Sequence, residues 1–408
     1  MAVNLAAPAA DALLPVAGIR LATVSAGIKK VGRQDVVLIE MAEGTHTAAV
    51  YTKNAFCAAP VLLAKAHQQQ QAPRYLLINS GNANAGTGEA GMQAATDCCM
   101  AVAKLTQVDT AAVLPFSTGV IGQPLPVAKI TAVLPEAVQT LAADNWFAAA
   151  HGIMTTDTIA KARSVQLELD GQTVTITGIS KGSGMIRPDM ATMLAYIATD
   201  AAVSDAVLKT MLHEVMEHSF NRITVDGDTS TNDACVLMAS GLAANREIDS
   251  ISSDEGQQLL AALTDLCRYL AQAIVRDGEG ATKFISIAVT QGQSQEECRQ
   301  VAYTIAHSPL VKTALFASDA NWGRILAAVG RSGLNNFDLS KVSIHLGDVC
   351  IVEQGQPAEA YTEEQGQKVM DQAEITISVQ LGRGQAEDLV WTCDFSYDYV
   401  KINAEYRT

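Results

Sequence analysis

The feature that most constrains this chain of 408 residues is a glycine-rich loop that runs directly into an apolar strand. The loop and the start of the strand occupy residues 181–194, with the sequence KGSGMIRPDMATML, and the strand continues to Thr199. Its β-branched and aromatic residues are typical of a buried strand. Thr192 lies at the junction, on a rigid element that faces a flexible loop, which suits a nucleophile. An ordinary strand entered through a glycine turn is the alternative, and spacing alone leaves both open.

The composition indicates a globular protein with more than one core. The chain is 49% hydrophobic and 17% charged, which excludes a disordered protein. Its length exceeds that of one simple core, so two domains or lobes are expected. No apolar run is long enough to span a bilayer, and the N-terminus lacks the basic start of a signal peptide. We therefore expect no membrane association and a cytoplasmic location.

The charge argues against a nucleic-acid partner. The net charge is −15, whereas a nucleic-acid-binding protein needs a basic face. Residues 1–191 contain equal numbers of acidic and basic residues, so the whole excess of negative charge falls on residues 192–408.

The cysteines and histidines predict neither disulfides nor a zinc site. The eight cysteines form no CxxC pair and lie mostly in apolar stretches, so buried, reduced thiols are expected. His213 and His218 are five positions apart, not the four of the HExxH motif. The acidic loop DGDTSTND at residues 226–233 lacks the glutamate at position twelve that calcium loops of the EF-hand type need. We interpret this loop as a hydrogen-bonded scaffold and expect no metal or other cofactor.

Hydrophobic periodicity predicts an α+β fold, with mixed sheets packed against helices and the active site between lobes. Two strands at 36–41 and 47–52 are expected to join through a turn at Glu43 and Gly44, and two at 163–169 and 172–179 to form a hairpin around Asp170 and Gly171. Further strands are expected at 75–78, 113–122, 192–199, 284–289, 342–353 and 374–380, and a last extended run at 389–403. Helices are expected at 89–105, 125–143, 145–152, 204–220, 256–275 and 294–305.

Several motifs, in the same order along nearly the whole chain, resemble the ornithine acetyltransferase family, also called the bifunctional glutamate N-acetyltransferase family. They are KGSGMI followed by Pro188 and MATML at the central stretch, NSGNAN at 79–84, Thr118 with Gly119, TTDT at 155–158, and DGDTSTND at 226–233. The resemblance implies that the protein cuts its own Ala191–Thr192 bond. It thus implies an alpha chain of residues 1–191 and a beta chain of residues 192–408. The implied fold is an αββα-like layered N-terminal-nucleophile enzyme.

The resemblance also implies a set of site residues. Thr118 and Gly119 correspond to the family's oxyanion hole, in which a hydroxyl and a backbone amide stabilise a tetrahedral intermediate. The implied substrate contacts are Thr155 (with Thr156 as the near alternative), Lys181, Thr192, Glu279, Asn403 and Thr408. For Glu279, a solvated loop glutamate is the alternative.

A freed N-terminal threonine carries its own base, because the α-amine has a reference pKa of roughly 7.7–8.0. The resemblance implies that Thr192 takes acetyl from N-acetylornithine and passes it to glutamate, in the cyclic pathway of arginine biosynthesis. Some members of the family also use acetyl-CoA, and both donors stay open for this chain. The implied assembly is an α2β2 heterotetramer.

Two alternatives remain at this point. An N-terminal-nucleophile aminopeptidase or amidase would use the same threonine, with water as the acceptor. A binding or structural protein would keep one uncut chain. The destination of a labelled acetyl group distinguishes the first alternative, and the intact mass distinguishes the second.

Overall fold

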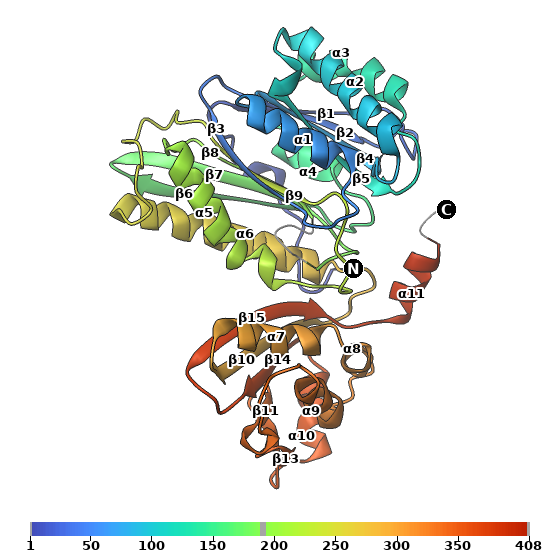
Figure 1. Cartoon of the computed structure of the whole chain (residues 1–408), viewed down its shortest axis with the longest axis vertical. Helices are drawn as coiled ribbons and strands as arrows, with labels where there is room; N and C mark the ends of the chain where they lie inside the picture. Colours follow the sequence, from blue (N-terminus) through green and yellow to red (C-terminus); the bar gives the residue numbers. More distant parts are fainter. Residues whose placement is uncertain (1, 188–192, 406–408) are drawn as a thin grey trace.

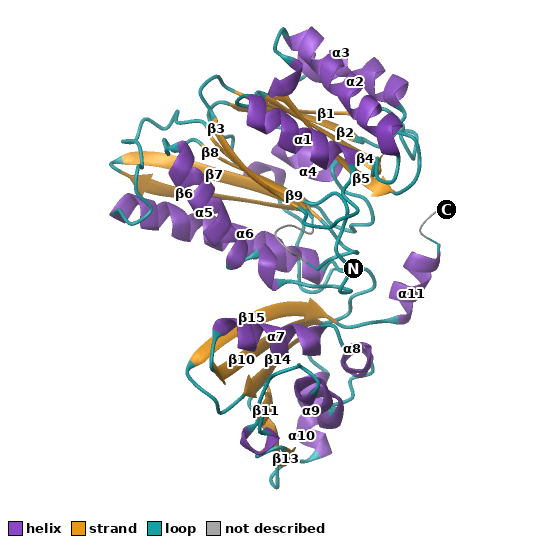
Figure 2. Ribbon diagram, viewed as in Figure 1, coloured by secondary structure: helices purple, strands orange, loops and turns teal. Residues whose placement is uncertain are grey.

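The computed structural model describes residues 2–187 and 193–405. They form three β-sheets with helices packed against them, which confirms the expected α+β class (Figures 1 and 2). The first sheet has the strand order β1 (Ile19–Val24), β2 (Val36–Met41), β4 (Tyr75–Asn82), β5 (Val113–Val120). The second has the order β3 (His46–Tyr51), β9 (Ala234–Ala239), β8 (Leu194–Thr199), β7 (Gln172–Lys181), β6 (Lys161–Leu169).

The first two sheets face each other across an apolar layer. Alternate residues of a strand point to opposite faces, so Ile78 of β4 packs toward the second sheet with Tyr196 of β8, whereas Leu77 packs toward α2. Because each sheet is covered on both faces, its strands are continuously apolar. The outer faces carry helices, which makes four layers, helix–sheet–sheet–helix. The helices are α2 (Gly88–Thr106) and α3 (Val127–Gln139) on the first sheet, α5 (Asp205–Glu217) and α6 (Asp254–Arg276) on the second, and α1 (Ala59–Gln70) and α4 (Trp146–Gly152), which add side chains to the layer between the sheets.

The third sheet lies in the C-terminal part of the chain, orange to red in Figure 1. Its order is β13 (Gln356–Pro357), β12 (Val349–Glu353), β11 (Ser343–Leu346), β14 (Glu374–Gln380), β10 (Phe284–Gly292), β15 (Ala386–Cys393). Its core is shared with α7 (Gln295–Ala306), α8 (Pro309–Phe316), α9 (Trp322–Gly330) and α10 (Glu363–Met370). Short 3-10 turns occur at Ala10–Ala12, Thr110–Ala112, Phe220–Arg222 and Leu339–Lys341, and the last helix is α11 (Tyr397–Ala404). No helix in the described ranges is both long enough and apolar enough to cross a membrane.

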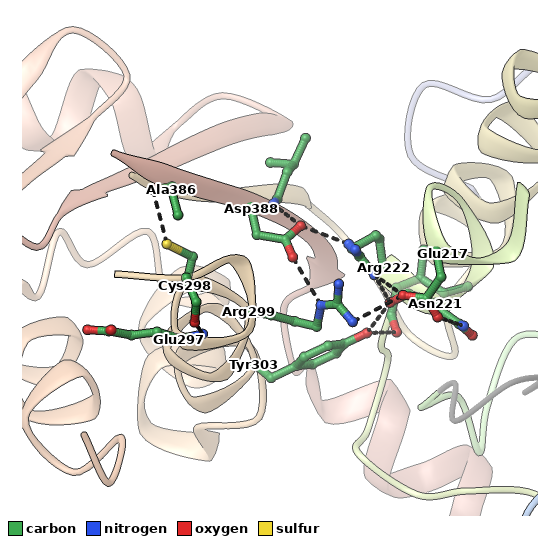
Figure 3. A network of polar contacts seen from close by, with 12 residues as sticks. Glu217, Asn221, Arg222, Glu297, Cys298, Arg299, Tyr303, Ala386 and Asp388 are labelled. Atoms are coloured by element: carbon green, nitrogen blue, oxygen red, sulfur yellow. Dashed lines mark hydrogen bonds and ion pairs between the residues drawn. The ribbon is translucent and has the colours of Figure 1, made fainter. Parts of the chain in front are cut away.

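An ionic network attaches the third sheet to the layered part (Figure 3). Asp388 of β15 accepts hydrogen bonds from Arg222 (2.8 Å) and from Arg299 of α7 (3.0 Å). Arg299 also donates to Glu217 of α5 at 3.1 Å. Because Arg222 and Asp388 are largely buried, these charges need each other as partners, and the network fixes β15 and α7 against α5.

The second sheet combines strands from both sides of residue 191. Strands β3, β6 and β7 precede this position, whereas β8 and β9 follow it. Strand β8 lies between β7 and β9, with Leu194 opposite both Lys181 and Ala234. The central glycine-rich loop thus leaves β7 and returns in β8 at neighbouring positions of one sheet.

The expected turn at Glu43 and Gly44 joins β2 to β3. The two strands do not pair with each other, because β2 pairs with β1 and β4 while β3 pairs with β9. Both edges of β2 are occupied, so the turn at Glu43 and Gly44 carries the chain from one sheet to the other. The expectation of a last extended run at 389–403 is wrong. Strand β15 ends at Cys393 and α11 begins at Tyr397.

Candidate active site

The predicted site residues that the structure describes line one cavity of about 370 Å³. They come from separate elements: the end of β5, the end of β7, the loop after α4, the turn after α6, and α11. They are Thr118, Gly119, Thr155, Lys181, Glu279 and Asn403, with Thr156 beside Thr155. Ala191, Thr192 and Thr408 lie outside the described residues.

Thr118 and Gly119 occupy the end of β5, where it pairs with β4. Gly119 has φ +136°, and a Cβ there would lie 2.3 Å from the carbonyl carbon of Gly81. Only glycine fits this backbone position. The Thr118 hydroxyl oxygen accepts a hydrogen bond from Nζ of Lys181 at 3.1 Å. Because a hydroxyl also has one proton to donate, Lys181 orients Thr118 and leaves this proton for another acceptor.

A buried aspartate links the end of β7, which carries Lys181, to the loop that carries Thr155. Asp157 accepts hydrogen bonds from the amides of Gly182 (2.8 Å) and Thr155 (2.9 Å) and from Nζ of Lys161 (2.7 Å). Burial alone would raise the pKa of Asp157, but Lys161 and Lys181 outweigh it and hold this pKa well below its usual range. Burial lowers the pKa of Lys181, against the opposing charge of Asp157. Asp157 therefore fixes the glycine-rich loop and the Thr155 loop in one arrangement.

The network continues from Lys161 to a third loop. Lys161 Nζ is 2.7 Å from Asp277, and both side chains are almost completely buried. The backbone carbonyl of Asp277 accepts the Ser183 hydroxyl at 2.7 Å, and the Ser183 carbonyl accepts the Glu279 amide at 2.8 Å. The loops that carry Thr155, Lys181 and Glu279 are thus tied together by one buried ionic group.

Glu279 is buried, with 6% of its surface exposed, which excludes the solvated loop glutamate. Its carboxylate accepts a hydrogen bond from Nδ2 of Asn403 at 2.8 Å, which joins α11 to the cavity. A Cβ on Gly184 would lie 2.4 Å from this carboxylate, so a glycine is needed there for the close approach. The carboxylate can accept a hydrogen bond from a ligand ammonium.

The acidic loop at 226–233 is the expected hydrogen-bonded scaffold. Asp226 accepts hydrogen bonds from the amides of Met185 (2.6 Å) and Ile186 (3.0 Å), and Asn232 donates to the Ala83 carbonyl at 2.6 Å. Across the described part of the chain, no group of three or more His, Cys, Asp or Glu is arranged to hold a metal ion. The eight cysteines are free thiols, six of them buried, which confirms that expectation.

Sequence reasoning missed Asp157, Lys161, Asp277 and Asp233. Asp233 is buried, and its Oδ2 has no hydrogen-bond partner among the residues that the structure describes. Burial raises its pKa well above the usual value. It lines a small cavity of about 30 Å³ together with Thr118, Lys181 and Met193. Lys161 is the first residue of β6, a strand that also contains Arg163, Gln166 and Glu168, so nothing in the sequence marked Lys161 or paired it with Asp277.

A lysine, a hydroxyl and a glycine thus meet at the wall of a cavity that also holds a carboxylate, and groups of this kind can stabilise an oxyanion beside a ligand. The class defined by this fold and site is an enzyme of acyl transfer. A sequence model of the ArgJ family matches residues 20–408, and the chain belongs to this family. It is an acyltransferase of arginine biosynthesis.

Several proteins of known sequence or structure are similar to this chain. The arginine biosynthesis bifunctional protein ArgJ of Pseudomonas syringae pv. tomato is 59% identical over 397 residues, 97% of this chain and 98% of its own length. The crystal structure of ArgJ from Bacillus halodurans is 41% identical, with a TM-score of 0.48, and covers 50% of this chain and 95% of its own. The ornithine acetyltransferase of Mycobacterium tuberculosis, solved with ornithine, is 34% identical, with a TM-score of 0.38, and covers 43% and 94% respectively.

Proposed function

We propose that this protein transfers an acetyl group from N-acetylornithine to glutamate through an acetyl-enzyme formed on Thr192. The observation that carries the proposal is the convergence of Thr118, Gly119, Lys181 and Glu279 on one cavity, although they lie far apart in the sequence. Met193, the residue after the proposed nucleophile, lines the small cavity that contains Thr118 and Lys181. Met193 therefore lies beside Thr118, one of the two proposed oxyanion donors.

The nucleophile is made by self-cleavage. The Thr192 hydroxyl attacks the Ala191 carbonyl, the peptide nitrogen leaves with a proton, and water hydrolyses the resulting ester. This releases residues 1–191 with a new carboxylate and residues 192–408 with a free α-amine. The proposed alpha chain carries the oxyanion pair, and the proposed beta chain carries the nucleophile. We propose that two copies of each form an α2β2 assembly.

Transfer then follows in two steps. The α-amine of Thr192 takes the hydroxyl proton, and the oxygen attacks the acetyl carbonyl of N-acetylornithine. Thr118 and Gly119 donate hydrogen bonds to the tetrahedral oxyanion, which collapses and expels ornithine with the proton. The α-amine of glutamate next attacks the acetyl ester and leaves as N-acetylglutamate, and the Thr192 hydroxyl is restored.

Two further elements belong to this proposal. Acetyl-CoA is included as a second donor, since the family resemblance allows it and the acetyl ester on Thr192 would be the same. The enzyme is placed in the cytoplasm, where free cysteine thiols such as these are normally maintained.

Intact-mass measurement of the purified protein tests the cleavage, with Thr192→Ala as the variant and Thr192→Ser as the conservative control. We expect two fragments from the wild type and the serine variant, and one inactive chain of 43.0 kDa from Thr192→Ala. Thr118→Ala should slow turnover by about a hundredfold. An active, uncut chain contradicts the proposal. Labelled acetate instead of labelled N-acetylglutamate would favour a hydrolase.

A further inference from the structure

A second cavity, of about 310 Å³, adjoins the first and shares four wall residues with it, Gly119, Val120, Thr155 and Thr156. Three of its lining residues are cations of the loop between β1 and β2, namely Lys29, Lys30 and Arg33. We call this cavity the cationic chamber. Small-molecule sites are commonly about 300–1,000 Å³, so the chamber adds a ligand-sized volume next to the oxyanion pair.

The chamber is basic in a strongly acidic chain. Its two acidic lining residues are Asp35 and Glu405. Asp35 is buried and accepts hydrogen bonds from the amides of Ala26 (2.7 Å) and Ile28 (2.6 Å), so both of its oxygens are engaged by its own loop. Glu405 is exposed, at the end of α11. The cations exceed the carboxylates, although the whole chain carries a net charge of −15.

Arg33 gives the chamber a fixed positive group. Its guanidinium is half-buried and donates to the backbone carbonyls of Met154 (2.5 Å) and Thr155 (3.4 Å). Carbonyl partners orient the guanidinium without neutralising it. In the described part of the chain, no carboxylate forms an ion pair with Arg33. Since a guanidinium has five N–H donors, donors remain for a ligand beside Thr155, one of the predicted substrate contacts.

Lys29 lies close to the oxyanion pair. A Cβ on Gly81 would be 3.1 Å from the Cβ of Lys29, and Gly81 itself is in tight contact with Gly119. The loop that carries Lys29 is therefore separated from Gly119 by Gly81 alone, so an acyl group held at Gly119 would lie near this cationic loop.

We propose that the cationic chamber binds the side-chain carboxylate of the acceptor amino acid. This inference rests on the proposed function, in which ornithine and glutamate use the same cavity in turn. The two amino acids share their α-amino and α-carboxylate groups and differ in the charge at the end of the side chain. The glutamate carboxylate lies about 5 Å from its α-nitrogen. Because Gly119 lines both cavities, a glutamate whose α-amine is aimed at an acyl group beside Gly119 can extend this carboxylate into the chamber. A guanidinium is the preferred partner for a carboxylate.

The phosphates of a thioester donor such as acetyl-CoA are also anionic oxygen groups, so the experiment includes both ligands. The test variants are Arg33→Met, which removes the charge, and Arg33→Lys, which keeps it. The matched control is Lys129→Met. Lys129 donates to the Gly27 carbonyl of the same loop at 2.7 Å but does not line the chamber.

Two half-reactions are measured separately for each variant: release of ornithine from N-acetylornithine in a single turnover, and kcat/KM for glutamate. We expect Arg33→Met to lower kcat/KM for glutamate by about 10–100-fold, the loss of one charge-assisted hydrogen bond. Ornithine release should stay within about twofold, because the donor has no side-chain carboxylate. In Arg33→Met, the ratio of kcat/KM for glutamine to kcat/KM for glutamate should increase. Arg33→Lys should recover most of the loss, and Lys129→Met should match the wild type.

Three results would overturn the proposal. Equal losses in both half-reactions would show that Arg33 only supports the Thr155 loop. A raised KM for acetyl-CoA with unchanged kinetics for glutamate would assign the chamber to phosphate. Unchanged kinetics in Arg33→Met would leave the chamber without a role in binding. A wild-type enzyme that forms no N-acetylglutamate is a different outcome, because it rejects the proposed function itself.

Discussion

Replacing Lys161 with methionine tests the idea that one buried ionic group organises the active-site loops. Lys161 lies 2.7 Å from Asp157 and 2.7 Å from Asp277, and the three side chains are at most 1% exposed. Methionine keeps much of the volume but removes the cation between two buried carboxylates, so that Asp277 loses its ion-pair partner and Asp157 keeps only the charge of Lys181 nearby. Removing one partner from a buried ion pair typically lowers the free energy of unfolding by about 3–5 kcal/mol. We expect a loss in this range.

The neighbouring strand position supplies the control. Arg163 forms an ion pair of similar length with Asp265, at 2.8 Å, but the two side chains are 35% and 59% exposed. Exposed pairs contribute about 0–1 kcal/mol, so Arg163→Met should have little effect. The assay is equilibrium urea unfolding followed by the fluorescence of the buried Trp146.

The dependence on pH distinguishes lost charge pairing from lost packing. In the wild type the pKa of Asp157 is lowered, so its stabilising contribution is present above the unfolded-state pKa and is lost only in strong acid. Without Lys161, burial raises this pKa, and the variant gains stability relative to the wild type as the pH falls from about 8 to about 5.5. A loss below about 1 kcal/mol, or a loss independent of pH, would refute the reasoning.

Three further predictions concern the site and its surroundings. Gly119→Ala should reduce turnover by at least about a hundredfold, because a Cβ has no room there, and normal turnover in a folded variant would remove Gly119 from the oxyanion role. Burial and nearby cations lower the pKa of His307 from 6.5 to about 4. As the pH falls, His307 therefore takes up its proton in the unfolded chain before it does so in the folded protein. The free energy of unfolding should decrease by up to about 3 kcal/mol as the pH falls from 6.5 to about 4. His307→Gln should flatten this part of the curve of unfolding free energy against pH. Asn403→Leu, which leaves Glu279 without its amide partner, should raise KM for N-acetylornithine by about tenfold, and an unchanged KM would show that the pair does not contact the donor.

Local sequence patterns were sufficient to predict elements whose structure depends only on neighbouring residues. The hairpin of β6 and β7 was predicted from Asp170 and Gly171, and both residues have positive φ in the structure. The strands with which β2 and β3 pair could not be predicted in this way. Each strand reads correctly on its own, but the choice of partner depends on which sheet edge is free, and that is a property of the whole fold.

The residues of the candidate site also fall into those that local motifs predict and those that only the complete fold brings together. Thr118, Gly119 and Lys181 lie in short motifs that resemble those of a known family, and this resemblance was enough to select them. The ionic group of Lys161 and Asp277 could not be selected in this way, because these residues are 116 positions apart and become partners only when α6 packs against β6. Helix α11 was missed for a related reason. The aromatic residues of 395–399 favour a strand locally, and only the context after β15 makes the segment helical.

The position of β8 has a consequence for how this protein is handled in the laboratory. If the bond before Thr192 is cut, the two products remain interleaved, because β8 stays paired with β7 on one edge and with β9 on the other. An affinity tag on either product would recover both, and only a denaturant would part them. Each half expressed alone would have open strand edges, which invite aggregation.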